Sequence, residues 1–266
     1  MTRRRLILSV APAVLLAQDR RARAQKVIDD ALAALGGPKF TGMKDRTEAG
    51  RVYSFYREQL SGASHARIFT RYLTRPEPPR IDFFGQRERQ SFGKDNKEES
   101  AVLFTENEGW QITFRGARPV AKDVEERYRL STLNNIFYIL RQRLGEPGMI
   151  LEHEGTDVVE NMPVDIVTLT DAENRSVKAF FHSSTKLPVR QEYVRRDEKT
   201  RDRFVELSRF SKYREVSGIQ WPFQIQRERD GEKIYEIFAE SVTINNDLLD
   251  TLFTLNTKIK VLPPAL

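Results

Sequence analysis

The sequence contains no cysteine among its 266 residues and only three histidines, His65, His153 and His182. A chain without cysteine can form neither a disulfide framework nor a thiol nucleophile, and it lacks the N-terminal cysteine on which a lipoprotein is lipidated. Three histidines leave few candidates for acid–base catalysis or metal binding. These absences favour a protein that works without side-chain or metal chemistry.

Motifs that carry chemistry are also missing. The sequence has no G-x-S-x-G nucleophile elbow, no phosphate-binding P-loop and no dinucleotide-binding G-x-G-x-x-G. Glu152, His153 and Glu154 look like metal ligands, but consecutive strand residues point to opposite faces and cannot all reach one ion. We therefore predict a non-enzyme with no catalytic residues, no metal site and no cofactor. Hydrolysis by a single activated serine is a remote alternative.

The charge is too balanced to indicate a nucleic-acid partner. The formal net charge is +6, from 44 basic and 38 acidic residues, and it falls to +3 without Arg3, Arg4 and Arg5. Basic and acidic side chains alternate through 195–199 and 227–230, a pattern typical of solvated surface rather than of a basic groove. We predict no nucleic acid among the ligands.

A hydrophobic run long enough to span a membrane is missing, but a shorter one follows the arginines at the N-terminus. Residues 6–17 are uncharged and mostly apolar, and as a helix they rise only about 18 Å, well short of the roughly 30 Å hydrocarbon core. This layout predicts a signal peptide over 1–17, cleaved after Ala17, and a single mature domain over 18–266 without a transmembrane anchor.

Three alternatives to that reading stay open. Ala22-Arg23-Ala24 is a second possible cleavage site, although the preceding arginines disfavour it. The arginines at 3–5 also fit a loose twin-arginine export signal. The whole segment could instead be a buried first helix of the fold. The prediction we prefer is a periplasmic protein of the bacterial envelope.

Hydrophobic periodicity divides the rest of the chain into two helices and about a dozen strands. Helical spacing runs over 23–35, ending at Gly36-Gly37, and again from an N-cap at Asp123 through Leu130, Leu133, Phe137, Leu140 and Leu144. Period-two alternation predicts strands at 51–58, 66–74, 80–87, 101–104, 110–115, 149–153, 164–170, 176–182, 189–194, 203–213, 219–226 and 233–244.

Strands with one apolar and one polar face predict a particular fold class. We expect a mainly β protein, a curved antiparallel sheet forming an open half-barrel, with two or more helices covering its concave side as a lid. The clearest alternation places Ile219, Trp221, Phe223 and Ile225 on one face of a strand. A chain of this size can bury one large core, so a single domain is expected.

The second half of the chain resembles a known family. Residues 185–190 (TKLPVR), 213–222 (YREVSGIQWP) and 246–253, which holds Asn246, Leu249-Asp250 and Phe253, are similar to the C-terminal half of LolA-like periplasmic carriers that sort outer-membrane lipoproteins. The resemblance spans roughly Glu152 to Leu255. It implies a half-barrel with an apolar concave face and a helical lid, as in carriers that shield an acyl chain from water.

Aromatic and aliphatic side chains on the apolar faces are the candidate ligand-binding residues. We predict that a cavity between sheet and lid is lined in part by Trp110, Ile112, Phe114, Phe137, Trp221 and Phe223. Each could equally be ordinary core, since the pattern requires only a shared face. The predicted function is binding or carriage of a lipid, a lipoprotein acyl chain or another amphiphile. The alternative is an envelope protein-interaction or sensor module that uses the same fold without a bound lipid.

Overall fold

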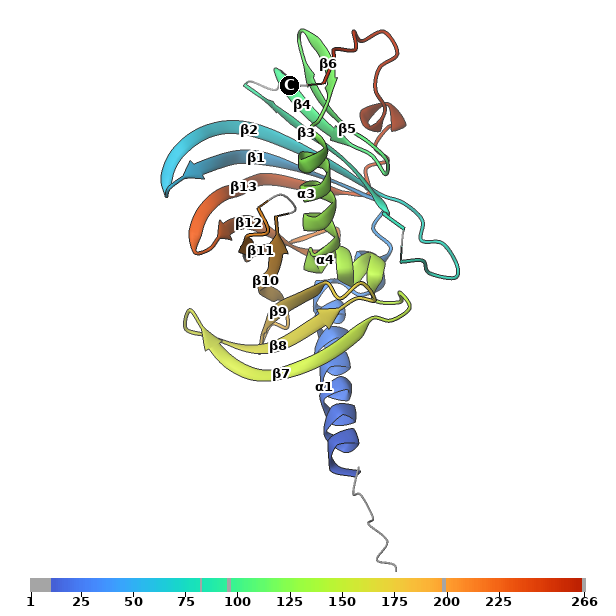
Figure 1. The fold of residues 1–266 in the computed structure, drawn as a ribbon, viewed down its shortest axis with the longest axis vertical. Helices are drawn as coiled ribbons and strands as arrows, with labels where there is room; N and C mark the ends of the chain where they lie inside the picture. Colours follow the sequence, from blue (N-terminus) through green and yellow to red (C-terminus); the bar gives the residue numbers. More distant parts are fainter. Residues whose placement is uncertain (1–10, 82, 95–96, 198–199, 265–266) are drawn as a thin grey trace, which may run out of the picture.

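One antiparallel sheet dominates the computed structural model, which describes residues 11–81, 83–94, 97–197 and 200–264. In that part of the chain thirteen strands run in the order β6-β5-β4-β3-β2-β1-β13-β12-β11-β10-β9-β8-β7. The sheet curves without closing, so β6 and β7 are its two edges (Figure 1). The predicted fold class, an open half-barrel with a helical lid, is confirmed.

The strand bounds follow the chain in two blocks that meet at the β1–β13 pair. The N-terminal block is β1 (Asp45–Tyr56), β2 (Gln59–Tyr72), β3 (Gln86–Gly93), β4 (Ser100–Phe104), β5 (Gly109–Thr113) and β6 (Gly116–Pro119). The C-terminal block is β7 (Ile150–Val159), β8 (Met162–Thr170), β9 (Ser176–His182), β10 (Pro188–Arg196), β11 (Arg203–Val216), β12 (Ile219–Arg229) and β13 (Glu232–Ile244).

Most predicted strands lie within observed ones, but two differences matter. The strand predicted at 80–87 begins only at Gln86, because the preceding 76–79 segment is proline-rich and the chain there is irregular. Strand β6 was missed, since four residues are too few to show a period. The C-terminal segment pairs with the edge strand β6. Ala117 N–H donates to Lys260 O at 2.9 Å, and Leu262 N–H donates to Ala117 O at 2.8 Å.

The first helix, α1 (Ala11–Leu35), packs along the β7 end of the half-barrel (Figure 1). Its buried stripe is Ala24, Ile28, Ala31 and Leu35, a helical spacing that matches the predicted amphipathic pattern. It ends at Gly36-Gly37 as predicted, and α2 (Pro38–Thr41) follows. A Cβ on Gly36 would stand 2.5 Å from Gly218 O, so this tight contact with the β11–β12 turn requires glycine.

The second predicted helix is three consecutive pieces rather than one. These are α3 (Lys122–Leu133), α4 (Ile136–Tyr138) and the π-helical turn η1 (Ile139–Arg143), which together we call the lid. Asp123 lies inside the first turn of α3, and Ala121 is the N-cap. The break falls at Asn134-Asn135, where the Asn135 side chain accepts the Phe137 N–H at 2.9 Å and starts a new helix.

The core is divided between the two faces of the sheet. The main cluster fills the concave side, where α1, α2 and the lid pack on β7–β13. A second cluster, Ala101, Leu103, Ile112, Ala117 and Phe253, lies on the convex side. There the C-terminal segment with the 3₁₀ turn η2 (Asp250–Phe253) covers β3 to β6 (Figure 1).

The N-terminal prediction is only partly within the described residues. Positions 1–10 of the predicted signal peptide lie outside them, and positions 11–17 form the beginning of α1. Of the helices described, none combines the length and apolar character that crossing a membrane requires.

Candidate functional site

A cavity of about 340 Å³ lies between the concave face of the central strands and the lid. We call it the inner cavity. Its apolar lining is Ile68, Phe137, Trp221, Ile225, Ile234 and Ile237. Its polar lining is Arg46, Glu48, Tyr72, Gln86, Glu88, Gln90, Tyr128, Ser131, Thr132, Asn135, Tyr138, Arg227 and Tyr235. Strands β1, β2, β3, β12 and β13 supply the floor, and α3 with α4 the roof.

Arg46 makes most of the polar contacts at one end of the inner cavity, which we call the Arg46 end. Its Nη1 donates to the Tyr72 hydroxyl at 2.6 Å and its Nη2 to Thr70 Oγ1 at 3.1 Å. Its Nε lies 2.7 Å from Glu48 Oε1, and its guanidinium stacks over the Trp221 ring at 4.1 Å. Burial alone would lower the pKa of Arg46, but Glu48 and Tyr72 outweigh it and the pKa is raised. The charge is held by contacts inside the protein.

Glu88 lies beside this pair without a cationic partner of its own. Its carboxylate accepts the amide of Gln90 at 2.6 Å and that of Gln86 at 3.2 Å. Among the described residues, no lysine or arginine stands within ion-pair distance of it. Burial raises the pKa of the Glu88 carboxyl above its ordinary value. The inner cavity thus contains a half-buried acid with no ion-pair partner among the described residues.

The apolar wall lies farther along the same strands, away from Arg46. Strand pairing sets Ile225 opposite Ile237, and Ile237 opposite Val52. A bulge in β13 leaves Ile234 without a partner on β12, so that Ile234 and its neighbour Tyr235 both reach the cavity. The wall continues into a small buried cluster of Val52, Ala66 and Ile237.

A second hollow of about 290 Å³, which we call the vestibule, adjoins the inner cavity. The two share lining from Gln90, Tyr128, Ser131, Asn135, Arg227 and Ile234. The vestibule adds Arg127, Arg195, Glu206 and Arg229, together with less polar residues of α3, β10 and β11. Because they share this lining, the inner cavity and the vestibule form one continuous space with a polar end at Arg46, an apolar middle and a charged end in the vestibule.

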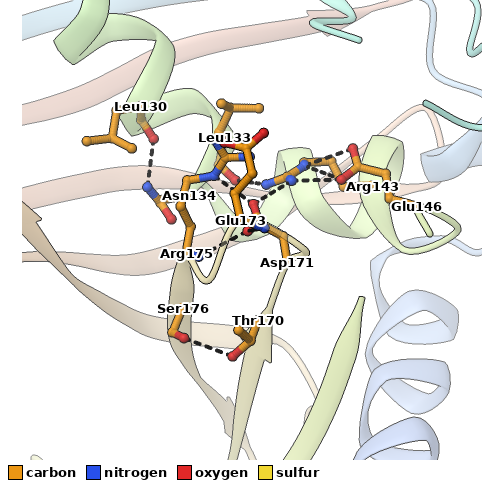
Figure 2. Close-up of polar contacts among 10 residues, drawn as sticks. All are labelled: Leu130, Leu133, Asn134, Arg143, Glu146, Thr170, Asp171, Glu173, Arg175 and Ser176. Atoms are coloured by element: carbon orange, nitrogen blue, oxygen red, sulfur yellow. Dashed lines mark hydrogen bonds and ion pairs between the residues drawn. The ribbon is translucent and has the colours of Figure 1, made fainter. Parts of the chain in front are cut away.

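The lower part of the lid is fixed by a buried ion network, which we call the lid network (Figure 2). Arg143 on η1 contacts Glu146 at 2.7 Å and Asp171, in the β8–β9 turn, at 2.8 Å. It also donates to Leu133 O at 2.8 Å, closing the end of α3. Arg175 contacts Asp171 at 2.6 Å. Although burial alone would raise it, these two arginines hold the pKa of the Asp171 carboxyl below its ordinary value.

Two glutamine side chains also hold α4 and η1 in place. Gln191 on β10 accepts the Ile136 N–H at 2.7 Å, and Gln142 donates to Gly85 O at 2.9 Å. Helix α3 contacts the sheet through Tyr128, whose ring stacks on Phe104 at 3.8 Å between centroids. The Tyr128 hydroxyl accepts the Gln86 amide at 3.0 Å. Arg129 on the same helix donates to Glu106 O, in the β4–β5 turn, at 3.4 Å, and Leu133 is buried in the main core. All three pieces of the lid are therefore held by contacts with the sheet side of the molecule.

The six sequence-predicted lining residues are divided by the structure. Phe137 and Trp221 line the inner cavity, and their rings lie 5.0 Å apart. Phe223 is buried in the main core beneath Arg214. Trp110 and Ile112 belong to the convex cluster around Phe253, and Phe114 is 89% exposed at the β5–β6 turn. The structure does not bring these last four to the inner cavity.

Sequence reasoning missed the polar lining. Arg46 and Glu48 on β1, and Gln86, Glu88 and Gln90 on β3, share a face through period-two spacing. That spacing was visible, but Arg87, Arg89 and Ser91 make the other face of β3 polar as well. No sequence signal therefore distinguished the inward face.

The histidine of the Glu152-His153-Glu154 segment faces an aspartate on the neighbouring strand β8. His153 Nε2 lies 3.3 Å from Asp165 Oδ1. Among the residues that the structure describes, no three histidine, aspartate or glutamate side chains gather as a metal site would need.

Comparison with solved structures defines the class: the chain has a LolA-like fold. A DUF1329 family protein from Desulfovibrio piger superposes with a TM-score of 0.58 at 14% identity, covering 87% of this chain and 97% of that chain. A putative outer membrane lipoprotein-sorting protein domain from Vibrio parahaemolyticus gives 0.54 at 11%, covering 86% and 97%. A LolA superfamily protein from Nitrosomonas europaea gives 0.51 at 12%, covering 87% and 97%.

No protein-family model matches the sequence, and a search of curated proteins finds no match. The resemblance seen in the C-terminal motifs is confirmed at the level of fold.

Proposed function

We propose that this protein binds and carries an amphiphile, namely a lipid, a lipoprotein acyl chain or a similar molecule, in the inner cavity. The observation that carries the proposal is the apolar middle of the continuous space, which is lined by Ile225 and Ile237 on the sheet and by Phe137 on the lid. Its 340 Å³ lies within the range typical of small-molecule sites. Each buried methylene contributes about 0.8 kcal/mol, so several suffice for binding without a dedicated motif.

The fold supports this proposal. One structural neighbour is described as a lipoprotein-sorting domain. The open half-barrel leaves ligand-sized space between its concave face and the lid. We further propose that the protein acts in the periplasm after export and cleavage near Ala17. N-terminal sequencing of envelope material tests this: a product that keeps Met1 and stays in the cytoplasm contradicts it.

Native mass spectrometry with lipid extraction tests the binding proposal. The isolated protein should carry bound amphiphile, and Ser131→Trp, which places an indole in both hollows, should abolish the bound mass. Lys122→Trp on the outer surface of the same helix is the matched control and should retain it. A folded wild-type protein that never carries or takes up an amphiphile contradicts the proposal and favours the protein-interaction alternative.

A further inference from the structure

The continuous space changes character in a fixed order along β12. Trp221, Ile225, Arg227 and Arg229 are separated by even numbers of residues, so their side chains leave the same face of the strand. Trp221 lies at the Arg46 end, Ile225 in the apolar middle, and Arg229 in the vestibule. A molecule lying along this strand meets a buried ion pair first, then hydrocarbon, then arginines.

The vestibule is rich in positive charge. Its lining holds Arg127, Arg195, Arg227 and Arg229 but one carboxylate, Glu206. Arg195 and Arg229 both direct Nε to Glu206 Oε1, at 3.0 and 2.9 Å.

Two further carboxylates contact these arginines from outside the lining. Asp123 lies 3.2 Å from Arg127, and Asp197 lies 3.9 Å from Arg195. Among the described residues, no carboxylate stands within ion-pair distance of Arg227, the arginine that borders both hollows. A negative group in the vestibule would therefore gain charge-assisted hydrogen bonds.

The Arg46 end is unsuited to a negative group. Arg46 Nη1 and Nη2 donate to Tyr72 and Thr70, and the guanidinium is already paired with Glu48, whose Oε1 lies 2.7 Å from a Nε that makes no hydrogen bond. Glu88 faces the same space, so an anion placed there would meet two carboxylates, Glu48 and Glu88, beside the single guanidinium of Arg46. An anionic head is thus disfavoured at one end of the space and favoured at the other.

We propose that the inner cavity and vestibule together select amphiphiles with an anionic head group, a phosphate or a carboxylate, held in the vestibule with the hydrocarbon chain in the inner cavity. This inference rests on the proposed function, because it assumes that the apolar middle accepts a chain. It adds the chemical class of the head group and the direction in which the ligand lies.

The test is titration calorimetry of the purified protein with four dodecyl amphiphiles below their micelle concentrations: dodecyl phosphate, dodecanoate, dodecyl maltoside and dodecylammonium. The two anions should bind about tenfold more tightly than the neutral maltoside, and dodecylammonium most weakly. The two anionic probes also distinguish a phosphate head from a carboxylate. Added salt should weaken the binding of the two anionic probes and leave the binding of the maltoside unchanged.

Arg227→Gln should remove most of the anion preference, measured as the ratio of the affinities for the two anions to the affinity for the maltoside. Arg51→Gln is the matched control, because Arg51 is an exposed β1 arginine that lines neither hollow, and it should change nothing. If the maltoside or dodecylammonium binds as tightly as the anions, or Arg227→Gln has no effect, the head-group inference is overturned while the proposed function stands. If none of the four binds, both are overturned.

Discussion

Glu48 Oε1 on β1 accepts the indole Nε1–H of Trp221 on β12 at 2.7 Å, across the intervening strand β13. The same oxygen faces Arg46 Nε at 2.7 Å. Residues 173 positions apart in sequence thereby share one buried contact at the Arg46 end of the inner cavity. This contact joins the N-terminal and C-terminal blocks of the sheet at the site itself.

Removing Glu48 should therefore destabilise the fold. Glu48→Ala leaves the Arg46 charge buried without its carboxylate, and we expect a loss of about 3–5 kcal/mol in the free energy of unfolding. Glu240→Ala breaks the exposed Arg51–Glu240 ion pair between β1 and β13 and should lower the free energy of unfolding by less than about 1 kcal/mol. Urea unfolding compares the two. Equal effects would mean that the buried pair is not held as described.

Glu88 should give stability an unusual pH dependence. Because burial raises its pKa in the folded state, the folded protein holds this proton more tightly than the unfolded chain does. Its contribution is thus fully present below its unfolded pKa of about 4.3 and is lost as pH rises through the folded pKa. We compare the free energy of unfolding of Glu88→Gln with that of the unmodified protein at the same pH. This difference should favour the variant more at pH 7 than at pH 4.

Glu228 is the control of opposite sign. Although burial alone would raise it, Arg209 holds the pKa of the Glu228 carboxyl below its ordinary value. Glu228→Gln should then cost stability at pH 7, and the cost should shrink as pH falls through the folded pKa. Urea unfolding at the two pH values measures both variants; parallel shifts in the two would contradict the assigned environments.

Phe137 connects the lid to the sheet. Its ring lies 4.9 Å from Phe210 and 5.0 Å from Trp221, and the side chain is buried. Phe137→Asp places a carboxylate there without a partner and should cost more than about 3 kcal/mol or open the inner cavity to an apolar dye. Phe137→Leu, which keeps an apolar side chain, should cost less. Unchanged stability and dye binding in Phe137→Asp would contradict the packing of the lid at this position.

The C-terminal segment should stabilise the convex face. Phe253 is 1% exposed in the convex cluster, so Phe253→Ala should cost about 3–5 kcal/mol. Leu249, four residues earlier, is 70% exposed, and Leu249→Ala should be nearly neutral. Thermal or urea unfolding distinguishes them. A neutral Phe253→Ala would show that this segment does not cover the sheet in solution.

Sequence patterns predicted the fold class because alternation and turns are local properties. The β12 strand was recognised since Ile219, Trp221 and Phe223 alternate with polar residues. The same rule could not say which face of β5 is concave. Leu103 pairs with Trp110 on the convex side, whereas its neighbour Phe104 stacks on Tyr128 under the lid. That choice depends on the C-terminal segment, which lies about 140 positions later in the chain.

The polar half of the site was beyond local reasoning for a related reason. Arg46 and Glu88 are charged residues on strands, and such residues ordinarily face water. Arg46 is buried and Glu88 half-buried because α3 lies over them and Trp221 packs on Arg46 from the other half of the chain. The break at Asn134-Asn135 was also missed, because the apolar stripe continues across it and only the Asn135 cap and Gln191 reveal two segments.

Quenching of tryptophan fluorescence by a bromine-labelled fatty acid tests the central claim most directly, since the two tryptophans lie on opposite faces of the sheet. Trp221 lines the inner cavity and Trp110 packs under the C-terminal segment. We predict saturable quenching that persists in Trp110→Phe, where Trp221 is the remaining indole, and disappears in a folded Trp221→Phe. Quenching of Trp110 instead, or no saturable quenching of Trp221 in the folded protein, would contradict acyl binding in the inner cavity.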